Sequence, residues 1–194
     1  MGIPAYFAWI IKNHKHIIQK LDTIKINKHI DNLYIDSNSI IYDSLDFTMY
    51  TNKHQFEEYI LTKVVDKLHS IINTVNPGKN VIIAFDGVPP IAKLNQQKNR
   101  RHKSWYQANI FEKRVVWDTC SITPGTCFMN KLDTTIKEHF SKSYTNINII
   151  LTLSNEPGEG EHKLFDYIRN NDHIHDTNVI YGMDADLIML SLNH

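Results

Sequence analysis

Cysteine is scarce in this chain: among its 194 residues only Cys120 and Cys127 occur. Two thiols without a second pair support neither a disulfide framework nor a four-ligand zinc site. We therefore expect both thiols to be free, as in a protein that works in a reducing compartment.

Long apolar runs are missing as well. No segment approaches the roughly 18 to 20 consecutive apolar residues that a membrane-spanning helix needs. Residues 1–7 lack the basic-then-apolar order of a signal peptide. There is no internal repeat and no Gly/Ser-rich linker, and 42% of the residues are hydrophobic. The sequence therefore predicts one domain over residues 1–194 of an intracellular protein, cytoplasmic or nuclear, with no membrane partner.

Net charge is absent too, because 21 Lys and Arg balance 21 Asp and Glu. This balance argues against a nonspecific nucleic-acid coat protein, but the charges are unevenly placed along the chain. Between residues 93 and 114 seven basic residues stand against one acid, whereas from residue 155 onward eight acids stand against two basic residues. A neutral total of this kind can hide a basic groove that faces an acidic pocket.

Apolar runs that alternate with helical periods are present. The strand candidates are 32–36, 81–86, 147–153, and a fourth extended region made of 178–181 and 187–192. Apolar residues recur at helical spacing over 56–72, and residues 123–126 are predicted to form a turn and N-cap before a helix over 128–140. The alternation predicts an α/β fold with a mainly parallel central sheet flanked by helices.

Six carboxylates stand beside these segments: Asp36, Asp86, Glu159, Glu161, Asp184 and Asp186. In parallel sheets, ligands bind beyond the carboxyl ends of the strands, which is where Asp36, Asp86 and Asp184 fall. If the segment is extended, Asp184 and Asp186 present both carboxylates to one side. The glycines that flank Glu159 and Glu161 permit backbone conformations that other residues avoid.

Carboxylates that lie close together repel, so a cation is expected between them. Oxygen ligands suit Mg²⁺ or Mn²⁺, and two such ions together activate water for phosphodiester cleavage. The neighbouring His162 is expected to pack beside the acids. The alternative is that each acid only caps a helix or forms a turn.

A basic row forms a second pattern. Its members share one face of a predicted helix at spacings i, i+4, i+7 and i+8: Lys93, Gln97, Arg100 and Arg101. An ammonium, an amide and two guanidinium groups that point one way suit a phosphate. A solvated basic helix face is the alternative. Trp105 and Tyr106 follow and could stack on bases or pack in the core.

Six motifs together resemble the N-terminal region of the Xrn family of 5′→3′ exoribonucleases, in the same order along the chain. They are Met1-Gly2-Ile3-Pro4 with Phe7 and Trp9, then 32–38, 85–101, 122–126, 157–163 and 184–190. The resemblance implies a PIN-like nuclease fold related to flap endonucleases. It also implies a Mg²⁺-dependent enzyme of RNA decay that releases mononucleotides from single-stranded RNA with a 5′-monophosphate.

Residue by residue, the resemblance implies that the six acids hold the metal ions and that the basic row forms the 5′-monophosphate pocket. Two positions depart from the family pattern, because Ser39 and Tyr42 stand where the family usually has Gly and His. The family His stacks on the first base. Tyr42 has a π-face and is expected to substitute for it, although, unlike His, it does not change its protonation near neutral pH.

The family's nuclease region continues beyond the length of this chain and supplies a further metal-binding Asp and more strands. The sheet is therefore expected to be incomplete on its C-terminal side, and a further segment or a protein partner is expected to complete it. Two alternative functions stay open. One is a catalytically weak module that binds RNA 5′ ends, and the other is an endonuclease of the flap or PIN type.

Overall fold

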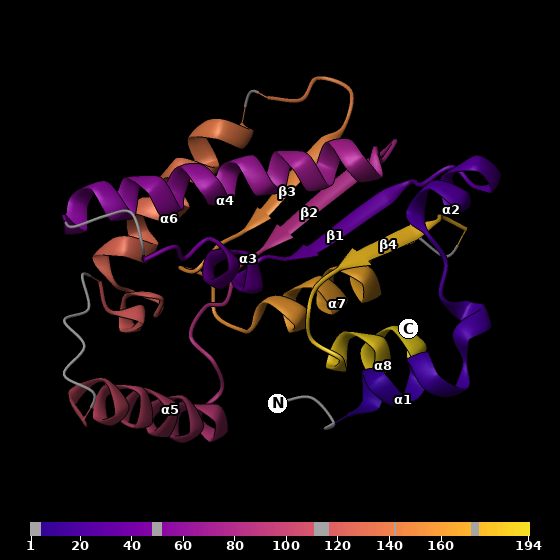
Figure 1. The fold of residues 1–194 in the computed structure, drawn as a ribbon. Helices are drawn as coiled ribbons and strands as arrows, with labels where there is room; N and C mark the ends of the chain where they lie inside the picture. The colour runs from indigo at the N-terminus through magenta and orange to yellow at the C-terminus, as the bar shows by residue number, and fades with distance from the viewer. Residues whose placement is uncertain (1–4, 48–51, 111–116, 142, 172–174) are drawn as a thin grey trace.

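The computed structural model describes residues 5–47, 52–110, 117–141, 143–171 and 175–194; within 91–110 it leaves out several side chains, those of Arg100, Arg101 and Trp105 among them. Figure 1 shows the path of the chain. Its elements are, in order, α1 (Tyr6–Asn13), η1 (Lys15–Ile17), α2 (Leu21–Asn27), β1 (Asn32–Asp36), α3 (Asn38–Asp43), α4 (Lys53–Val75), β2 (Asn80–Ala84), α5 (Ile91–Ile110), η2 (Thr119–Ser121), α6 (Cys127–Phe140), β3 (Asn148–Thr152), α7 (Gly160–Asn170), β4 (Asn178–Tyr181) and α8 (Asp186–Leu192).

The four strands form one parallel sheet in the order β3-β2-β1-β4 (Figure 1). Parallel neighbours cannot be joined by a tight turn, and each connection here passes through at least one helix. The predicted α/β class with a parallel central sheet is confirmed, and it is consistent with a PIN-like fold. The strand predictions 32–36, 81–86 and 147–153 match β1, β2 and β3 to within two residues.

The fourth strand prediction was right only in its first half. Residues 178–181 form β4, but 187–192 belong to helix α8. The segment is rich in Leu and Met, which favour helices, and its only β-branched residue is Ile188. A short apolar run cannot be assigned to strand or helix from periodicity alone.

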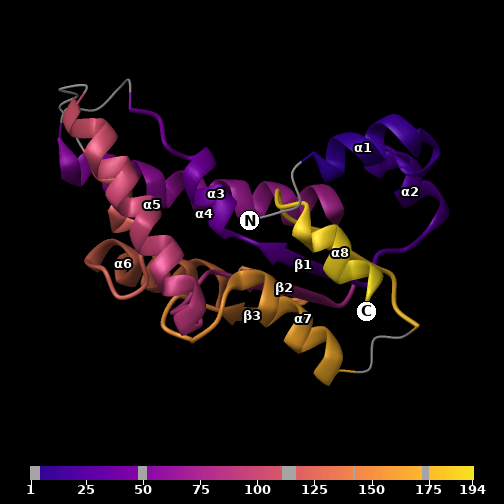
Figure 2. The ribbon, with the colours of Figure 1, turned by 90° about the horizontal axis from the view of Figure 1, so that it is seen from below.

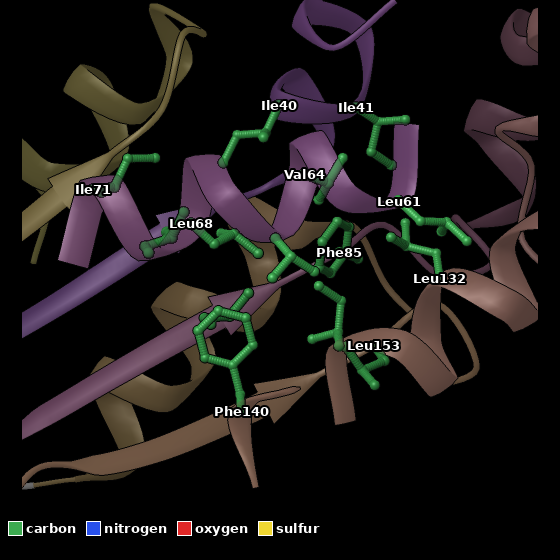
Figure 3. Packing of buried hydrophobic residues seen from close by; sticks show 14 of the residues in the cluster. Ile40, Ile41, Leu61, Val64, Leu68, Ile71, Phe85, Leu132, Phe140 and Leu153 are labelled. Atoms are coloured by element: carbon green, nitrogen blue, oxygen red, sulfur yellow. The ribbon is translucent and has the colours of Figure 1, made fainter. Parts of the chain in front are cut away.

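Helices cover the two faces of the sheet unequally. α4 and α6 lie on one face and α7 lies on the other (Figures 1 and 2). Figure 3 shows Val64 and Leu68 of α4 packed toward Phe85, close to Leu153 and to Phe140 of α6. Burying each such side chain contributes about 1.5 to 3 kcal/mol. Since Phe85 is fully buried and directly precedes Asp86, the core fixes the backbone beneath that carboxylate.

The helix predictions hold. The periodic stretch 56–72 lies inside α4, which ends at Asn76 in the left-handed conformation (φ 54°). Thr126 is the N-cap of α6, since its hydroxyl accepts a hydrogen bond from the amide of Met129. Both cysteines are free, as predicted. Across the described ranges, no helix has the length and the apolar character to cross a membrane.

Asparagine side chains link the amino ends of all four strands. Each strand begins with Asn, and the four residues are in register: Asn148, Asn80, Asn32 and Asn178. Hydrogen bonds run from Asn148 to Asn80 (3.2 Å), from Asn80 to Asn32 (2.7 Å) and from Asn32 to Asn178 (2.8 Å). Strands buried on both faces are uniformly apolar, so alternation of side chains specifies their register poorly. The ladder of asparagine side chains therefore helps to fix the strand register at the amino ends of the strands, opposite the acids.

Candidate functional site

The carboxyl ends of β1 and β2 bring two acids together. Asp36 is the last residue of β1, and Asp86 follows β2 by two residues. Asp86 is oriented on both of its oxygens: the amide of Gly160 donates to Oδ1 (2.7 Å) and Asn38 Nδ2 donates to Oδ2 (2.6 Å). These two bonds tie the end of β2 to α3 and to the start of α7.

The β3–α7 turn supplies the next two acids. Glu159 is the N-cap residue of α7, and Glu161 lies in its first turn. Gly158 has a φ of 103°, a conformation that other residues rarely adopt. A Cβ on Gly160 would lie 2.6 Å from Asp36 Oδ1, so a larger residue here would displace that carboxylate. The glycines of this motif therefore allow four carboxylates to converge.

Of Asp184 and Asp186, Asp184 alone is named in the lining of the cavity. Asp184 lines the cavity beside the other acids, whereas Asp186 begins α8 and its amide donates to Asp184 Oδ1 (3.3 Å). The premise of an extended segment was wrong here. Ala185 between them has helical rather than extended backbone angles (φ −66°, ψ −18°), so the alternation of an extended strand does not apply to these two side chains.

One cavity of about 460 Å³ collects these residues at the carboxyl edge of the sheet. Five of the six predicted acids line it. Its full lining is Asp36, Asn38, Ser39, Tyr42, Asp86, Lys93, Gln97, Glu159, Glu161, Met183 and Asp184. Ligands of parallel α/β sheets bind at this edge.

Burial and mutual repulsion shape the electrostatics of the cavity. Burial, followed by the negative charges of Asp86 and Glu161, raises the pKa of Asp36 to about 7. Burial also raises the pKa of Asp86 and of Glu161. Carboxylates held this close are expensive to ionise together unless a cation lies among them.

Lys93 supplies one such cation from α5. Its ammonium lies 2.5 Å from Glu159 Oε2 and 3.7 Å from Glu161 Oε1. Burial alone would lower the pKa of Lys93, but the hydrogen bond and charge of Glu159 together with the charges of Glu161 and Asp86 outweigh burial and raise it. Gln97 lines the same cavity one helical turn further on. The side chains of Arg100 and Arg101, the other members of the predicted basic row, lie outside what the structure describes.

Tyr42 stands at the mouth of the cavity. It lies near the end of α3 and is 50% exposed, so its ring is accessible from solvent. Tyr106 of α5 is also exposed, at 63%, and therefore is not a core residue. Trp105 is among the side chains that the structure leaves out.

Three oxygen and nitrogen donors are grouped tightly enough for a metal ion. Ligand atoms of Glu159, Glu161 and His162 all lie within 4.8 Å of one another. Carboxylate oxygens suit hard divalent cations, and an imidazole is compatible with Mn²⁺. The residues therefore fit a divalent metal, and His162 lies beside the acids as expected.

Sequence reasoning missed two residues that organise the acids. Asn38 orients Asp86, and a polar residue two positions after a strand-end acid was the signal for it. Lys163 is buried on α7, and its ammonium donates to the carbonyls of Phe85 and Leu153 (2.8 Å each). Burial lowers the pKa of Lys163. Nothing in the sequence distinguishes this lysine from an exposed one.

Comparison with known proteins gives a consistent result. A family model described as XRN 5′-3′ exonuclease N-terminus matches residues 1–194. The 5′-3′ exoribonuclease 1 of Saccharomyces cerevisiae is 34% identical over an alignment that covers 100% of this chain and 14% of that relative. The 5′-3′ exoribonuclease 2 of Eremothecium gossypii is 32% identical, with 99% of this chain and 26% of the relative covered.

The 5′-3′ exoribonuclease 2 of Cryptococcus neoformans var. neoformans is also 32% identical, with 99% of this chain and 22% of the relative covered. The chain thus spans about a quarter or less of the length of these curated relatives. The Eremothecium alignment spans 244 positions against the 194 residues here, so that relative carries insertions within the matched region. Correspondences are therefore carried over motif by motif.

Proposed function

We propose that this chain forms the N-terminal part of a nuclease domain that acts on RNA. The premise is that the chain belongs to the family of XRN 5′-3′ exonuclease N-termini. In this proposal it removes mononucleotides from the 5′ end of single-stranded RNA that bears a 5′-monophosphate. The observation that carries the proposal is the single cavity in which five acids meet Lys93 and Gln97. The proposed cleavage centre and the proposed phosphate-binding site then lie in the same cavity.

The acids are proposed to hold two Mg²⁺ or Mn²⁺ ions: Asp36, Asp86, Glu159, Glu161, Asp184 and Asp186. When bound, such ions supply an activated water and stabilise the attacking and leaving oxygens. Asn38 and the Gly160 amide hold the Asp86 carboxylate in one orientation. In the described residues Asp186 is not part of the cavity lining, so its place among the metal ligands rests on the family motif alone.

The terminal phosphate is proposed to bind the basic row on α5. Lys93 and Gln97 reach the cavity, and Arg100 and Arg101 occupy the next turn of the same helix. Guanidinium groups grip two phosphate oxygens at once. Tyr42 is proposed to stack on the first base from the rim of the cavity.

Comparison of two RNAs tests this function. RNA with a 5′-monophosphate is expected to be degraded about tenfold or more faster than the same RNA with a 5′-hydroxyl, because charge-assisted hydrogen bonds to the phosphate are lost in the latter. Arg100→Ala should remove the preference, whereas Lys98→Met, an exposed change on the same helix, should keep it. Equal rates for the two RNAs would refute the pocket assignment, and internal fragments as first products would favour the endonuclease.

A second candidate is a module that binds RNA 5′ ends without cutting them. The contact of Lys93 with Glu159 favours it, because this ammonium already neutralises part of the acidic cluster. Salt-sensitive RNA binding without detectable cleavage at saturating Mg²⁺ would support this candidate over the exonuclease.

A further inference from the structure

Lys163 is a buried lysine behind the acidic cavity. The residue is only 9% exposed and lies in the first turns of α7. Its ammonium donates to the carbonyl of Phe85, which directly precedes Asp86, and to the carbonyl of Leu153, which follows β3. One side chain thus ties the ends of β2 and β3 to the helix that carries Glu159 and Glu161.

The stem of Lys163 also supports the glycine turn. A Cβ on Gly158 would lie 3.7 Å from Lys163 Cγ and 3.9 Å from Cε, so the lysine stem packs directly against this turn. The turn is joined to the Asp86 segment by two backbone hydrogen bonds, from Gly87 to Gly158 (2.8 Å) and from Gly158 to Val88 (3.0 Å). Lys163 therefore contacts every backbone segment that carries Asp86, Glu159 or Glu161.

The charge of Lys163 is unusual for a residue that only packs. The carboxylates whose charge acts on it are Glu156, Asp86 and Asp133. In the described part of the chain none of them pairs with it within the 4.0 Å of a salt bridge. A buried ammonium without a paired carboxylate is expensive, and an apolar side chain of similar length would avoid that cost. An apolar side chain would, however, leave the carbonyls of Phe85 and Leu153 without this donor, so the ammonium is needed where the two strand ends meet α7.

We propose that Lys163 is a positioning residue for the cation site, a fixed internal ammonium that holds Asp86, Glu159 and Glu161 in the geometry that binds a divalent metal. This inference rests on the proposed function. It assigns opposite effects to the two lysines near the same acids. Lys93 competes with the metal ion for Glu159, whereas Lys163 acts from behind and never enters the cavity lining.

Titration of the chain with Mn²⁺ alone, followed by the electron paramagnetic resonance of the free ion, tests the proposal. Lys163→Met keeps the length of the stem and removes the ammonium. We expect its Mn²⁺ dissociation constant to rise about tenfold or more, as for other residues that orient metal ligands. Loss of a nearby positive charge alone would instead tighten binding, so weaker binding identifies lost geometry.

Lys131→Met is the matched control. Lys131 bridges α4 and α6 through Glu57 (2.9 Å), far along the chain from the acids, so its loss should lower stability and leave Mn²⁺ affinity unchanged. Urea unfolding of each variant establishes that it is folded. If Lys163→Met does not fold, Lys163→Gln, which removes the charge and keeps an amide NH₂ with two donors, takes its place with the same expectation.

A folded Lys163 variant that binds Mn²⁺ as tightly as the wild type, or more tightly, overturns the positioning role. A wild-type chain that binds no Mn²⁺ overturns the proposed function itself. The two failures are therefore distinguishable.

Discussion

Individual carboxylates at the strand ends could be found from the sequence because each interrupts an apolar run at a place where a buried strand should end. Asp36 and Asp86 are examples, and both line the cavity. The residues that orient them could not be found in the same way. Whether Lys163 is buried depends on how α7 packs on two strands, which no local pattern encodes. The acids can thus be identified from the local sequence, whereas their orientation depends on tertiary packing.

The crowding of Asp36 predicts a pH dependence of stability in the absence of metal. Its pKa is raised from 3.8 to about 7 in the folded protein. A raised pKa contributes stability that is fully present below about pH 4 and is lost as the pH rises through 7. Urea unfolding in EDTA should therefore show that the free energy of unfolding of Asp36→Asn, relative to the wild type, increases by about 2 kcal/mol as the pH rises from 5 to 8. The exposed Asp22→Asn serves as control, and parallel curves for Asp36→Asn and wild type would contradict the crowding.

Lys93 leads to a prediction of the opposite sign from that for Lys163. Lys93→Met removes the ammonium that competes for Glu159, so Mn²⁺ should bind up to about fivefold more tightly. The same change should weaken the preference for 5′-monophosphate RNA, because one phosphate donor is lost. Mn²⁺ titration and paired RNA rates measure the two effects, with Lys98→Met as the control. Weaker Mn²⁺ binding in Lys93→Met would show that this lysine supports the metal site.

Secondary-structure elements followed their sequence patterns where the pattern was long. The strands β1 to β3 and the helix α4 appear where alternating apolar runs and helical periods place them. The strand prediction for the short Leu-rich run at 187–192 was wrong, because six residues carry too little periodicity to separate strand from helix. That error removed the reason for expecting Asp184 and Asp186 to point to one side, and the role of Asp186 stays a prediction.

The asparagine ladder carries the prediction at this scale. Asn32 is fully buried, and its Oδ1 accepts the hydrogen bond from Asn80. Asn80→Ala leaves that acceptor unsatisfied and should destabilise the fold by about 1 to 3 kcal/mol in urea unfolding. Asn171→Ala, at an exposed helix end, should change stability by less than about 0.5 kcal/mol. A neutral Asn80→Ala would mean that the ladder does not hold the strands.

The whole molecule separates its charge by function. Acids gather where the turn before α7 and the start of α8 meet the strand ends. Helix α5 contains no acid, and it brings the basic Lys93 to the same edge. A neutral total therefore conceals an acidic group and a basic helix that meet at one edge of the sheet. The sequence predicted this division, but only the structure shows that Lys93 and the acids share one cavity. The participation of Arg100 and Arg101 in the phosphate pocket stays a prediction.

The most direct measurement is the first product released from RNA that carries a labelled 5′-monophosphate. With Mg²⁺ the chain should release labelled mononucleotide, and with EDTA it should release none, because the acids cannot activate water without a metal ion. Asp86→Asn should reduce release to background while the variant stays folded. Labelled mononucleotide formed equally well in EDTA, or by Asp86→Asn, would contradict the account, as would a labelled first product longer than one nucleotide.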